Sequence, residues 1–263
     1  MFTVICTQQQ SGRLRQLFSR QEYYLNTVSE GRVRFFVLTV KGGKKVNWER
    51  LYHMLGEQGQ GVLLQEGLIP PTAAFFRSPN TAEYTHRMAC NAAEKILRRR
   101  AAFREEKILF LDENLEFEKE ANRLLRYCDR LTVMTDRTQG YFSLNQEDIR
   151  YIPIGSELPL QDYSFAFAPR LSKRVTESGF DCGRTPLVVG VAEDITQSVG
   201  TVMTGFAAPL PEQYRLFLPE RVDELDFAAA LYCCCGETAL GEAFPDRCDI
   251  YQDGKPIANR TAF

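Results

Sequence analysis

The clearest pattern of apolar and polar positions lies between residues 107 and 136. An apolar run at 107–111 is followed by apolar residues at helical spacing and then by a β-rich run at 131–135. A continuous apolar run, then apolar residues about 3.6 positions apart, and then a second continuous run indicate a strand, a helix and a strand. Two strands that are connected in this way are parallel, with a right-handed crossover. We expect the helix at 114–127. Four apolar residues should pack it on the sheet: Phe117, Ala121, Leu124 and Leu125.

The N-terminal part of the chain has the pattern of an antiparallel hairpin. Residues 23–28 and 33–40 are rich in aromatic and β-branched residues, and a short loop that contains Gly31 separates them. Asn47 is placed to cap a following helix, because its side chain can accept a hydrogen bond from a free backbone amide. Residues 62–64 are apolar and predict a short buried strand.

A longer helix should begin after Asn80 and extend to about Arg100. Asn80 is followed three residues later by Glu83, which is the spacing of a capping box. One face of this helix is narrow and carries small residues, so that the helix can lie close to a sheet. The residues of this face are Ala89, Ala92, Ala93, Ile96 and Leu97.

The pattern is weaker beyond residue 136. Short apolar runs predict strands at 152–155, 164–168 and 187–191. Pro219 should begin a helix that ends in a cluster of three cysteines, with Gly236 as its C-terminal cap. Near the end of the chain, an Asp-Gly pair at 253–254 is typical of a tight hairpin.

The unit at 107–136 resembles the opening of a Rossmann-like nucleotide-binding domain, in which an acid at the tip of the second strand binds the ribose hydroxyls. Asp136 occupies that position here. The Gly-x-Gly-x-x-Gly turn that brings the backbone close to a pyrophosphate is missing, and the turn reads Asp112-Glu113-Asn114-Leu115-Glu116. Its three carboxylates suit the positive end of the helix dipole and repel phosphate. We therefore expect that NAD and NADP do not bind with their pyrophosphate on this helix.

These elements predict an α/β fold: a mixed sheet with a parallel Rossmann-like βαβ unit at 107–136 and an antiparallel N-terminal hairpin. A chain of 263 residues can form one domain or two unequal lobes. Residues 1–105 carry 16 Lys and Arg against 8 Glu, a net charge of +8, whereas residues 106–263 carry 16 against 26, a net charge of −10. The expected lobes are therefore a basic one at 1–105 and an acidic one at 106–263, with a single continuous domain as the alternative. The opposed charges could line a shared cleft, or they could be an accident of composition.

The candidate ligand-binding residues lie at the tips of predicted strands, where α/β proteins bind ligands. They are Asp112, Glu113, Asp136 and Gly155. Each has a structural alternative: Asp112 and Glu113 could cap the helix, and Asp136 and Gly155 could be ordinary turn residues. No residues are assigned to catalysis. Only two histidines are present, and each fits a helix surface better than a catalytic role.

Composition and cysteine spacing exclude several classes of protein. Hydrophobic residues at 44% and charged residues at 25% exclude a disordered chain. No apolar run reaches the ~18 to 20 residues of a membrane span and no cleavable leader is visible, so we expect a soluble cytoplasmic protein without a membrane partner. The eight cysteines have no chelating spacing, which predicts neither structural zinc nor a disulfide framework.

A net charge of −2 argues against a nucleic-acid partner. The basic cluster at Arg98–Arg100 with Arg104 could still form an anion-binding patch, or it could complement the dipole at a helix end. No cofactor is predicted, and the sequence does not fix the oligomeric state. Two functions stay open: a binding or assembly role for a core that lacks the phosphate loop, or an enzyme that acts on a nucleotide, a sugar or another small polar ligand at the strand tips.

Overall fold

The structure of the protein is a computed structural model. The contacts within the chain divide it into two compact units. Unit 1 contains residues 1–84 and 209–241, and unit 2 contains residues 85–208 and 242–263. The structure describes residues 1–8, 20–42, 45–56, 61–71, 76–100, 106–156, 162–177 and 185–262. The two units are treated separately below, and the expected division of the chain at residue 105 stays a prediction.

Unit 1 contains a four-stranded sheet in the order β2-β3-β1-β4. Its strands are β1 (Phe2–Gln8), β2 (Glu22–Glu30), β3 (Val33–Lys41) and β4 (Val62–Leu64). The antiparallel β2-β3 pair confirms the predicted hairpin, and β4 confirms the strand at 62–64. The sequence pattern did not predict β1, which pairs parallel to both β3 and β4.

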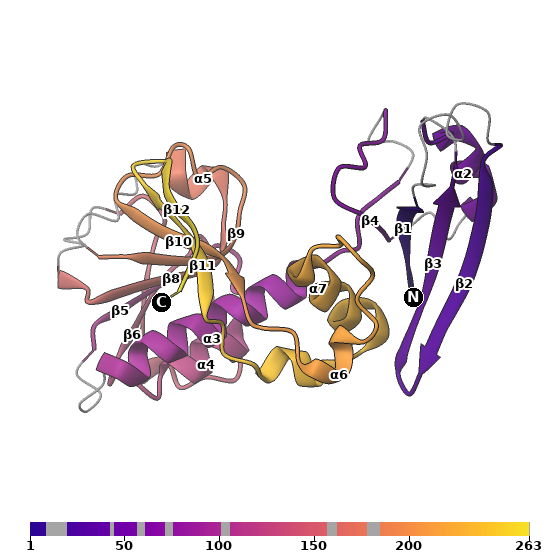
Figure 1. Ribbon diagram of the computed structural model, residues 1–263. Coiled ribbons are helices and arrows are strands. Elements are labelled where there is room, and N and C mark those ends of the chain that lie inside the picture. Colours follow the sequence, from indigo (N-terminus) through magenta and orange to yellow (C-terminus); the bar gives the residue numbers. More distant parts are fainter. Residues whose placement is uncertain are drawn as a thin grey trace. The chain divides into compact units, whose positions relative to one another are not determined.

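Helices cover both faces of this sheet (Figure 1). On one face, α2 (Trp48–Leu55) buries Leu51 and Leu55 in a cluster with β3 residues such as Leu38. On the other face, α7 (Glu224–Cys235) places the ring of Phe227 5.4 Å from that of Phe35. Residues 35 and 38 of β3 are separated by an odd number of positions, so their side chains point to opposite faces.

Side-chain caps fix where the helices of unit 1 begin. Asn47 accepts a hydrogen bond from the amide of Arg50 at 3.0 Å, which confirms the predicted cap of α2. The prediction that α7 begins at Pro219 is wrong. A short helix, α6 (Glu212–Arg215), precedes a turn, and Asp223 then accepts the amides of Leu225 and Asp226, so that α7 begins at Glu224. Gly236, with φ of 73°, ends α7 as expected.

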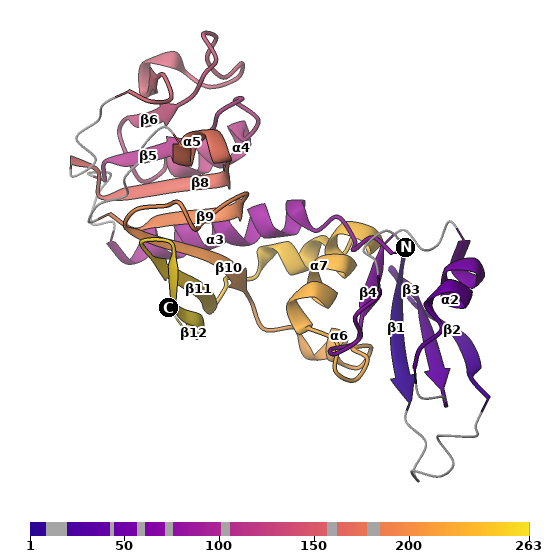
Figure 2. The ribbon, with the colours of Figure 1, turned by 90° about the horizontal axis from the view of Figure 1, so that it is seen from above.

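Unit 2 contains an eight-stranded sheet in the order β12-β11-β10-β9-β8-β5-β6-β7, which can be followed along the sheet in Figure 2. The strands from β7 to β10 are parallel to their neighbours, and β11 and β12 continue the sheet antiparallel. The strands are β5 (Ile108–Leu111), β6 (Leu131–Met134), β7 (Ile149–Ile152), β8 (Phe165–Leu171), β9 (Leu187–Ala192), β10 (Thr201–Ala207), β11 (Arg247–Gln252) and β12 (Lys255–Ala262).

The predicted βαβ unit is confirmed by the parallel register of β5 and β6, in which Leu109 faces Thr132. Its helix, α4 (Glu118–Leu124), is shorter than the predicted 114–127. Ala121 and Leu124 are buried as expected. The residues before Glu118 form a tight loop instead of a first helical turn, because the amides of Glu116 and Phe117 donate to the carboxylate of Asp112.

Helices also cover both faces of the sheet of unit 2, with α3 and α4 below it and α5 (Lys173–Glu177) above it in Figure 1. The long helix α3 (Ala82–Arg100) has most of its length in this unit. Its small-residue face lies close to β9, since a Cβ added at Gly190 would lie 3.3 Å from that of Ala89 and would overlap the carbonyl oxygen of Pro169. The described residues also include 3₁₀ turns at Gln146–Asp148 before β7 and at Thr238–Glu242 after α7.

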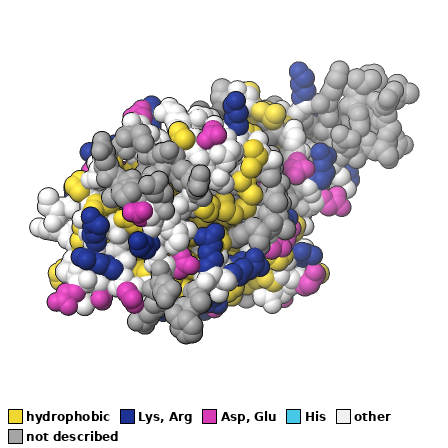
Figure 3. Space-filling model, turned by 90° about the vertical axis from the view of Figure 1, so that its left-hand side faces the viewer, with side chains coloured by type: hydrophobic (Ala, Val, Ile, Leu, Met, Phe, Trp, Pro, Cys, Tyr) yellow, Lys and Arg dark blue, Asp and Glu magenta, His cyan; other side chains and the backbone are white. Residues whose placement is uncertain are grey.

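Two general features of the chain bear on function. Among the helices of the described residues, none combines the length and the apolar character needed to cross a membrane. On the face of unit 2 that Figure 3 presents, Lys and Arg side chains are interspersed with Asp and Glu side chains. One face of unit 2 does not test the predicted charged cleft between two lobes, and this cleft stays a prediction.

Candidate functional site

Asp112 follows β5 directly and is almost completely buried, with 2% of its surface exposed. Its carboxylate accepts three hydrogen bonds: from the amide of Glu116 at 3.0 Å, the amide of Phe117 at 2.8 Å and the hydroxyl of Tyr141 at 2.7 Å. The N-cap residue of α4 is Phe117, which makes no side-chain capping bond. Asp112 therefore organises the loop before the helix and does not act as the N-cap.

The loop after β5 contains a strained residue. Leu115 has φ of 58°, in the left-handed region that a leucine rarely adopts, and its amide donates to the carbonyl oxygen of Asp112 at 3.3 Å. Such a conformation costs about 1 kcal/mol or more. After this turn, the amides of Glu116 and Phe117 donate to the two oxygens of one carboxylate, Oδ1 and Oδ2 of Asp112. Successive amides that converge in this way form an anion-binding nest, and here the carboxylate of Asp112 fills it.

Burial raises the pKa of both the Asp112 carboxylate and its hydroxyl partner, Tyr141. Burial raises the pKa of Asp112 above its ordinary value, and the three hydrogen bonds that it accepts oppose this change. Burial also raises the pKa of Tyr141, and the neighbouring charge of Asp112 raises it further. Tyr141 consequently stays protonated at neutral pH and remains the donor of this pair.

The structure brings Glu113 and Asp136 together at the tips of β5 and β6. The amide of Asp136 donates to the carbonyl oxygen of Glu113 at 3.2 Å, and the hydroxyl of Thr135 donates to the same oxygen at 2.9 Å. Arg174 of α5 forms an ion pair with the carboxylate of Asp136, and its guanidinium also lies 3.7 Å from the carboxylate of Glu113. Both acids thus contact one cation, whose own side chain is 66% exposed.

Gly155 lies apart from these acids, in a turn after β7. Its φ of 83° requires the conformational freedom of glycine, and the amide of Ser156 closes the turn on the carbonyl oxygen of Pro153 at 3.2 Å. Because β7 pairs with β6, Gly155 is at the same edge of the sheet as Asp136. A ligand role for Gly155 stays a prediction.

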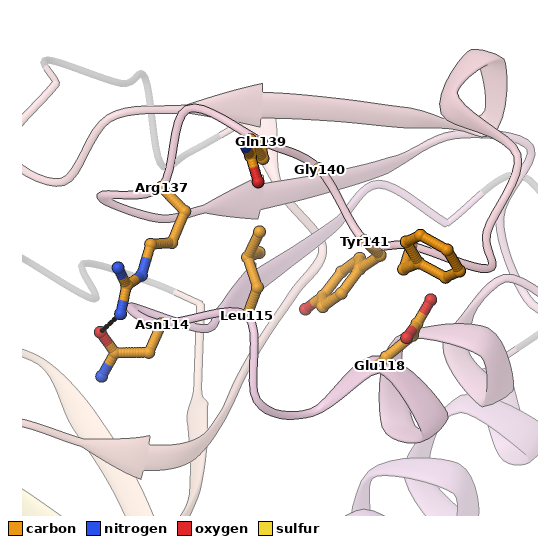
Figure 4. Close-up of a pocket in the computed structure, with 8 residues that line it drawn as sticks. Asn114, Leu115, Glu118, Arg137, Gln139, Gly140 and Tyr141 are labelled. Carbon is orange, nitrogen blue, oxygen red and sulfur yellow. Dashed lines mark hydrogen bonds between the residues drawn. The ribbon is translucent and has the colours of Figure 1, made fainter.

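A cavity of about 330 Å³ lies at the carboxyl ends of β5 and β6 (Figure 4). It is lined by residues of the two loops that follow these strands and by the first turn of α4. The lining residues are Asn114, Leu115, Glu118, Arg137, Gln139, Gly140, Tyr141 and Phe142. The sequence analysis missed this set. The available signal was a pair of adjacent aromatic residues directly after a glycine, in an otherwise polar loop.

The loop after β6 is held at several points around this cavity. Tyr141 donates its amide to the hydroxyl of Tyr151 at 2.9 Å, and Glu118 accepts both the amide and the hydroxyl of Ser143, at 2.6 and 2.7 Å. These hydrogen bonds lower the pKa of Glu118. Phe142, between the two anchored residues, is 101% exposed, so the loop displays an aromatic ring to solvent at the cavity.

The described residues include no cluster of three or more His, Cys, Asp or Glu side chains that could hold a metal ion. Seven cysteines are free thiols, and Cys182 lies outside the described residues. Cys235, in the cluster at the end of α7, donates to the carbonyl oxygen of Arg34 at 3.3 Å. Titration of eight thiols in the unfolded protein remains the test of the predicted absence of disulfides.

The basic end of α3 makes contacts within unit 2. Arg98 donates to the hydroxyl of Tyr127 at 3.2 Å, and its guanidinium lies 4.9 Å from the centre of the Phe244 ring. Arg100 donates to the carbonyl oxygen of Ser164 at 2.8 Å. Arg104 lies outside the described residues. Arg98 and Arg100 thus join α3 to neighbouring segments, and the anion-binding alternative for the cluster stays a prediction.

The histidine of unit 2 also contributes to the loop after β5. His86 of α3 packs edge-on against Phe117 with ring centres 5.0 Å apart, and burial lowers the pKa of His86.

The description of this site depends only on the residues of the chain itself. No family model matches the chain, and a comparison with curated proteins found no match.

Proposed function

We propose that unit 2 binds a small polar ligand in the cavity at the carboxyl ends of β5 and β6, and that binding is the role of this unit. The observation that carries the proposal is the cavity itself, with its convergent amide, guanidinium and carboxylate groups beside two aromatic rings. A volume of about 330 Å³ lies at the lower end of the range of small-molecule sites.

The order of the parallel strands supports this location. Counted from β5, the order of the strands from β7 to β10 is that of a doubly wound Rossmann-like sheet, in which the direction of winding reverses beside the first strand. Ligands of such sheets bind outside the carboxyl ends of the strands near that reversal. The cavity lies at the same edge of the sheet, at the ends of β5 and of β6, which is the neighbour of β5 on the side away from β8.

The filled nest argues against a dinucleotide as this ligand. A pyrophosphate needs the free amides at the start of the first helix, and here Asp112 accepts the amides of Glu116 and Phe117. A complex with NAD or NADP whose pyrophosphate contacts these two amides would contradict this part of the proposal. Binding of either compound elsewhere would leave it intact.

An enzyme that acts on a nucleotide or a sugar is the second candidate. Glu113 and Asp136 lie at adjacent strand tips and are partly exposed, with 24% and 25% of their side chains accessible, so hydroxyl groups of a ligand could compete with Arg174 for them. Free thiols in the described part of the chain favour a reducing, cytoplasmic setting for either role.

The test is a thermal-shift screen with nucleotides, sugars, small carboxylic acids and divalent metal ions. A ligand at 100 times its dissociation constant stabilises the folded state by about 2.7 kcal/mol. Gln139→Trp should obstruct the cavity and abolish the shift. Thr138→Trp is the matched control, because Thr138 is an exposed residue of the same loop that does not line the cavity.

Three outcomes separate the candidates. A shift that is lost in Gln139→Trp and retained in Thr138→Trp supports a ligand site in the cavity. A shift that both variants retain, but that is lost when Asp136 is replaced, favours the strand-tip enzyme. The absence of any shift across the panel would refute the proposal.

A further inference from the structure

The cavity contains two charged side chains, and they differ in how their hydrogen-bonding groups are used. The carboxylate of Glu118 already accepts the amide and the hydroxyl of Ser143. Arg137 makes one long hydrogen bond, to the side-chain oxygen of Asn114 at 3.4 Å. A guanidinium has five N–H donors, so most donors of Arg137 are without a described partner. Glu118 keeps its negative charge, because both donors are neutral groups that bind one of its oxygens, Oε1, so the cavity is positive only at its Arg137 end.

The position of Arg137 is set by the backbone. Its amide donates to the hydroxyl of Thr135 at 3.2 Å, directly after β6. Figure 4 shows Arg137 and Asn114 at one end of the cavity, with Leu115 between them and Tyr141. The planar guanidinium of Arg137 matches the geometry of a carboxylate or a phosphate, which it can bind through two parallel hydrogen bonds.

An apolar surface completes the cavity. Leu115 lines it, and Phe142 lines it from a loop that is anchored on both sides of that residue. The hydrogen bonds on both sides anchor the backbone around Phe142, and its fully exposed ring is accessible to a ligand. The ring and the guanidinium thus offer two different contacts to one small molecule.

From these observations we infer that the ligand of the cavity is a small oxyanion with an apolar or aromatic part: its carboxylate or phosphate binds Arg137, and its apolar part contacts Phe142. This inference rests on the proposed ligand site and names the chemical class of its ligand. The single anionic group of this ligand would bind beside Arg137, on the side of Leu115 away from Tyr141. This position differs from the one that a pyrophosphate would take, which the carboxylate of Asp112 fills.

The experiment uses four probes on the full chain, with binding followed by the amide NMR signals of Gln139 and Gly140. Phenylacetate and phenyl phosphate combine a ring with an anion, phenylacetamide has the ring without the charge, and acetate has the charge without the ring. Probes of this size bind with dissociation constants of about millimolar. At least one aromatic anion should bind more tightly than both phenylacetamide and acetate. Comparison of the two aromatic anions separates a carboxylate site from a phosphate site.

Variants assign the two contacts. Arg137→Gln should weaken the aromatic anion by ~10- to 100-fold, the usual effect of losing charge-assisted hydrogen bonds, and should leave phenylacetamide unchanged. Arg150→Gln is the matched control, because Arg150 is an exposed arginine of β7 outside the cavity. Phe142→Ala should weaken the aromatic anion by ~10-fold and leave acetate unchanged. Both side chains are exposed, so the unfolding temperature should not change.

The outcomes distinguish this inference from the proposed function. If phenylacetamide binds in the cavity as tightly as both aromatic anions, or if Arg137→Gln has no effect on them, the anionic class is wrong and the ligand site stands. If no probe and no compound of the wider panel perturbs the signals of Gln139 and Gly140, the proposed function fails as well.

Discussion

Replacement of Asp112 tests the central feature of unit 2, a carboxylate that fills an anion-binding nest of its own chain. In Asp112→Ala, the amides of Glu116 and Phe117 and the hydroxyl of Tyr141 lose their common acceptor. Each hydrogen bond to a charged group contributes about 1.5 to 3 kcal/mol. Removal of the buried carboxylate also removes the free energy cost of its desolvation, and this offsets part of the lost hydrogen-bond free energy. We expect a net loss of about 3 kcal/mol in the free energy of unfolding.

Urea unfolding at neutral pH measures this loss. A change of this size corresponds to a decrease of about 6 to 12 °C in the unfolding temperature of a chain of this length. Lys119→Ala, at an exposed position of α4, is the control and should change the free energy of unfolding by less than about 0.5 kcal/mol.

Chemical rescue separates the nest from a general packing defect. The vacated nest in Asp112→Ala keeps two converging amides and a hydroxyl, and formate is small enough to replace the missing carboxylate. Increasing formate should therefore stabilise Asp112→Ala more than the wild-type protein, with chloride at the same ionic strength as the control. A loss below about 1 kcal/mol, or an equal effect of formate on both proteins, would show that the carboxylate does not organise this loop.

Three further predictions concern titration and packing. Burial raises the pKa of Asp112 above its ordinary 3.8, so the folded protein binds this proton more tightly than the unfolded chain does. The free energy of unfolding of the wild type relative to Asp112→Asn should therefore fall as the pH rises from 3.8 through the raised pKa, and level off above it. Hydrogen bonds from Ser143 lower the pKa of Glu118, so NMR titration should place it below 4.5, and Ser143→Ala should return it toward that value; a stabilisation by Glu118 is then lost as the pH falls through the lowered pKa. Gly190→Ala should cost about 2 kcal/mol, because the new methyl group overlaps a backbone carbonyl oxygen, and a neutral effect measured by urea unfolding would contradict the close packing of α3 on β9.

The sequence predicted those elements whose signal is local. The period change at 107–136 identified β5, α4 and β6, and the runs around Gly31 identified the hairpin of β2 and β3. Strand β1 was missed because its partners are parallel and distant in sequence, so no turn signal accompanies it. The start of α7 was misplaced because proline at a first helical position is a weaker determinant than Asp223, which makes two capping bonds.

The candidate site was predicted in part. Carboxylates at the strand tips were recognised, and Glu113 and Asp136 do lie together. The role of Arg174 could not be predicted, because it follows β8, whose position beside β5 depends on the order of the whole sheet. The cavity was missed for a related reason. It depends on the left-handed conformation of Leu115, and no local propensity assigns that conformation to a leucine.

The internal carboxylate and the cavity are two consequences of one turn. Leu115 lines the cavity, and its left-handed conformation also aims the following amides at Asp112. Tyr141 connects the same two features, since it lines the cavity and its hydroxyl is bound to Asp112. A phosphate in the nest would have to displace Asp112 and so release the tyrosine that forms one wall of the cavity. In this structure the amides of Glu116 and Phe117 are thus bound by the chain's own carboxylate, beside the cavity that Leu115 and Tyr141 line. On this argument the aromatic anions should bind more weakly in the cavity of the Asp112→Ala protein, measured by the amide signals of Gln139 and Gly140 and apart from any anion in the vacated nest, although Asp112 does not line the cavity.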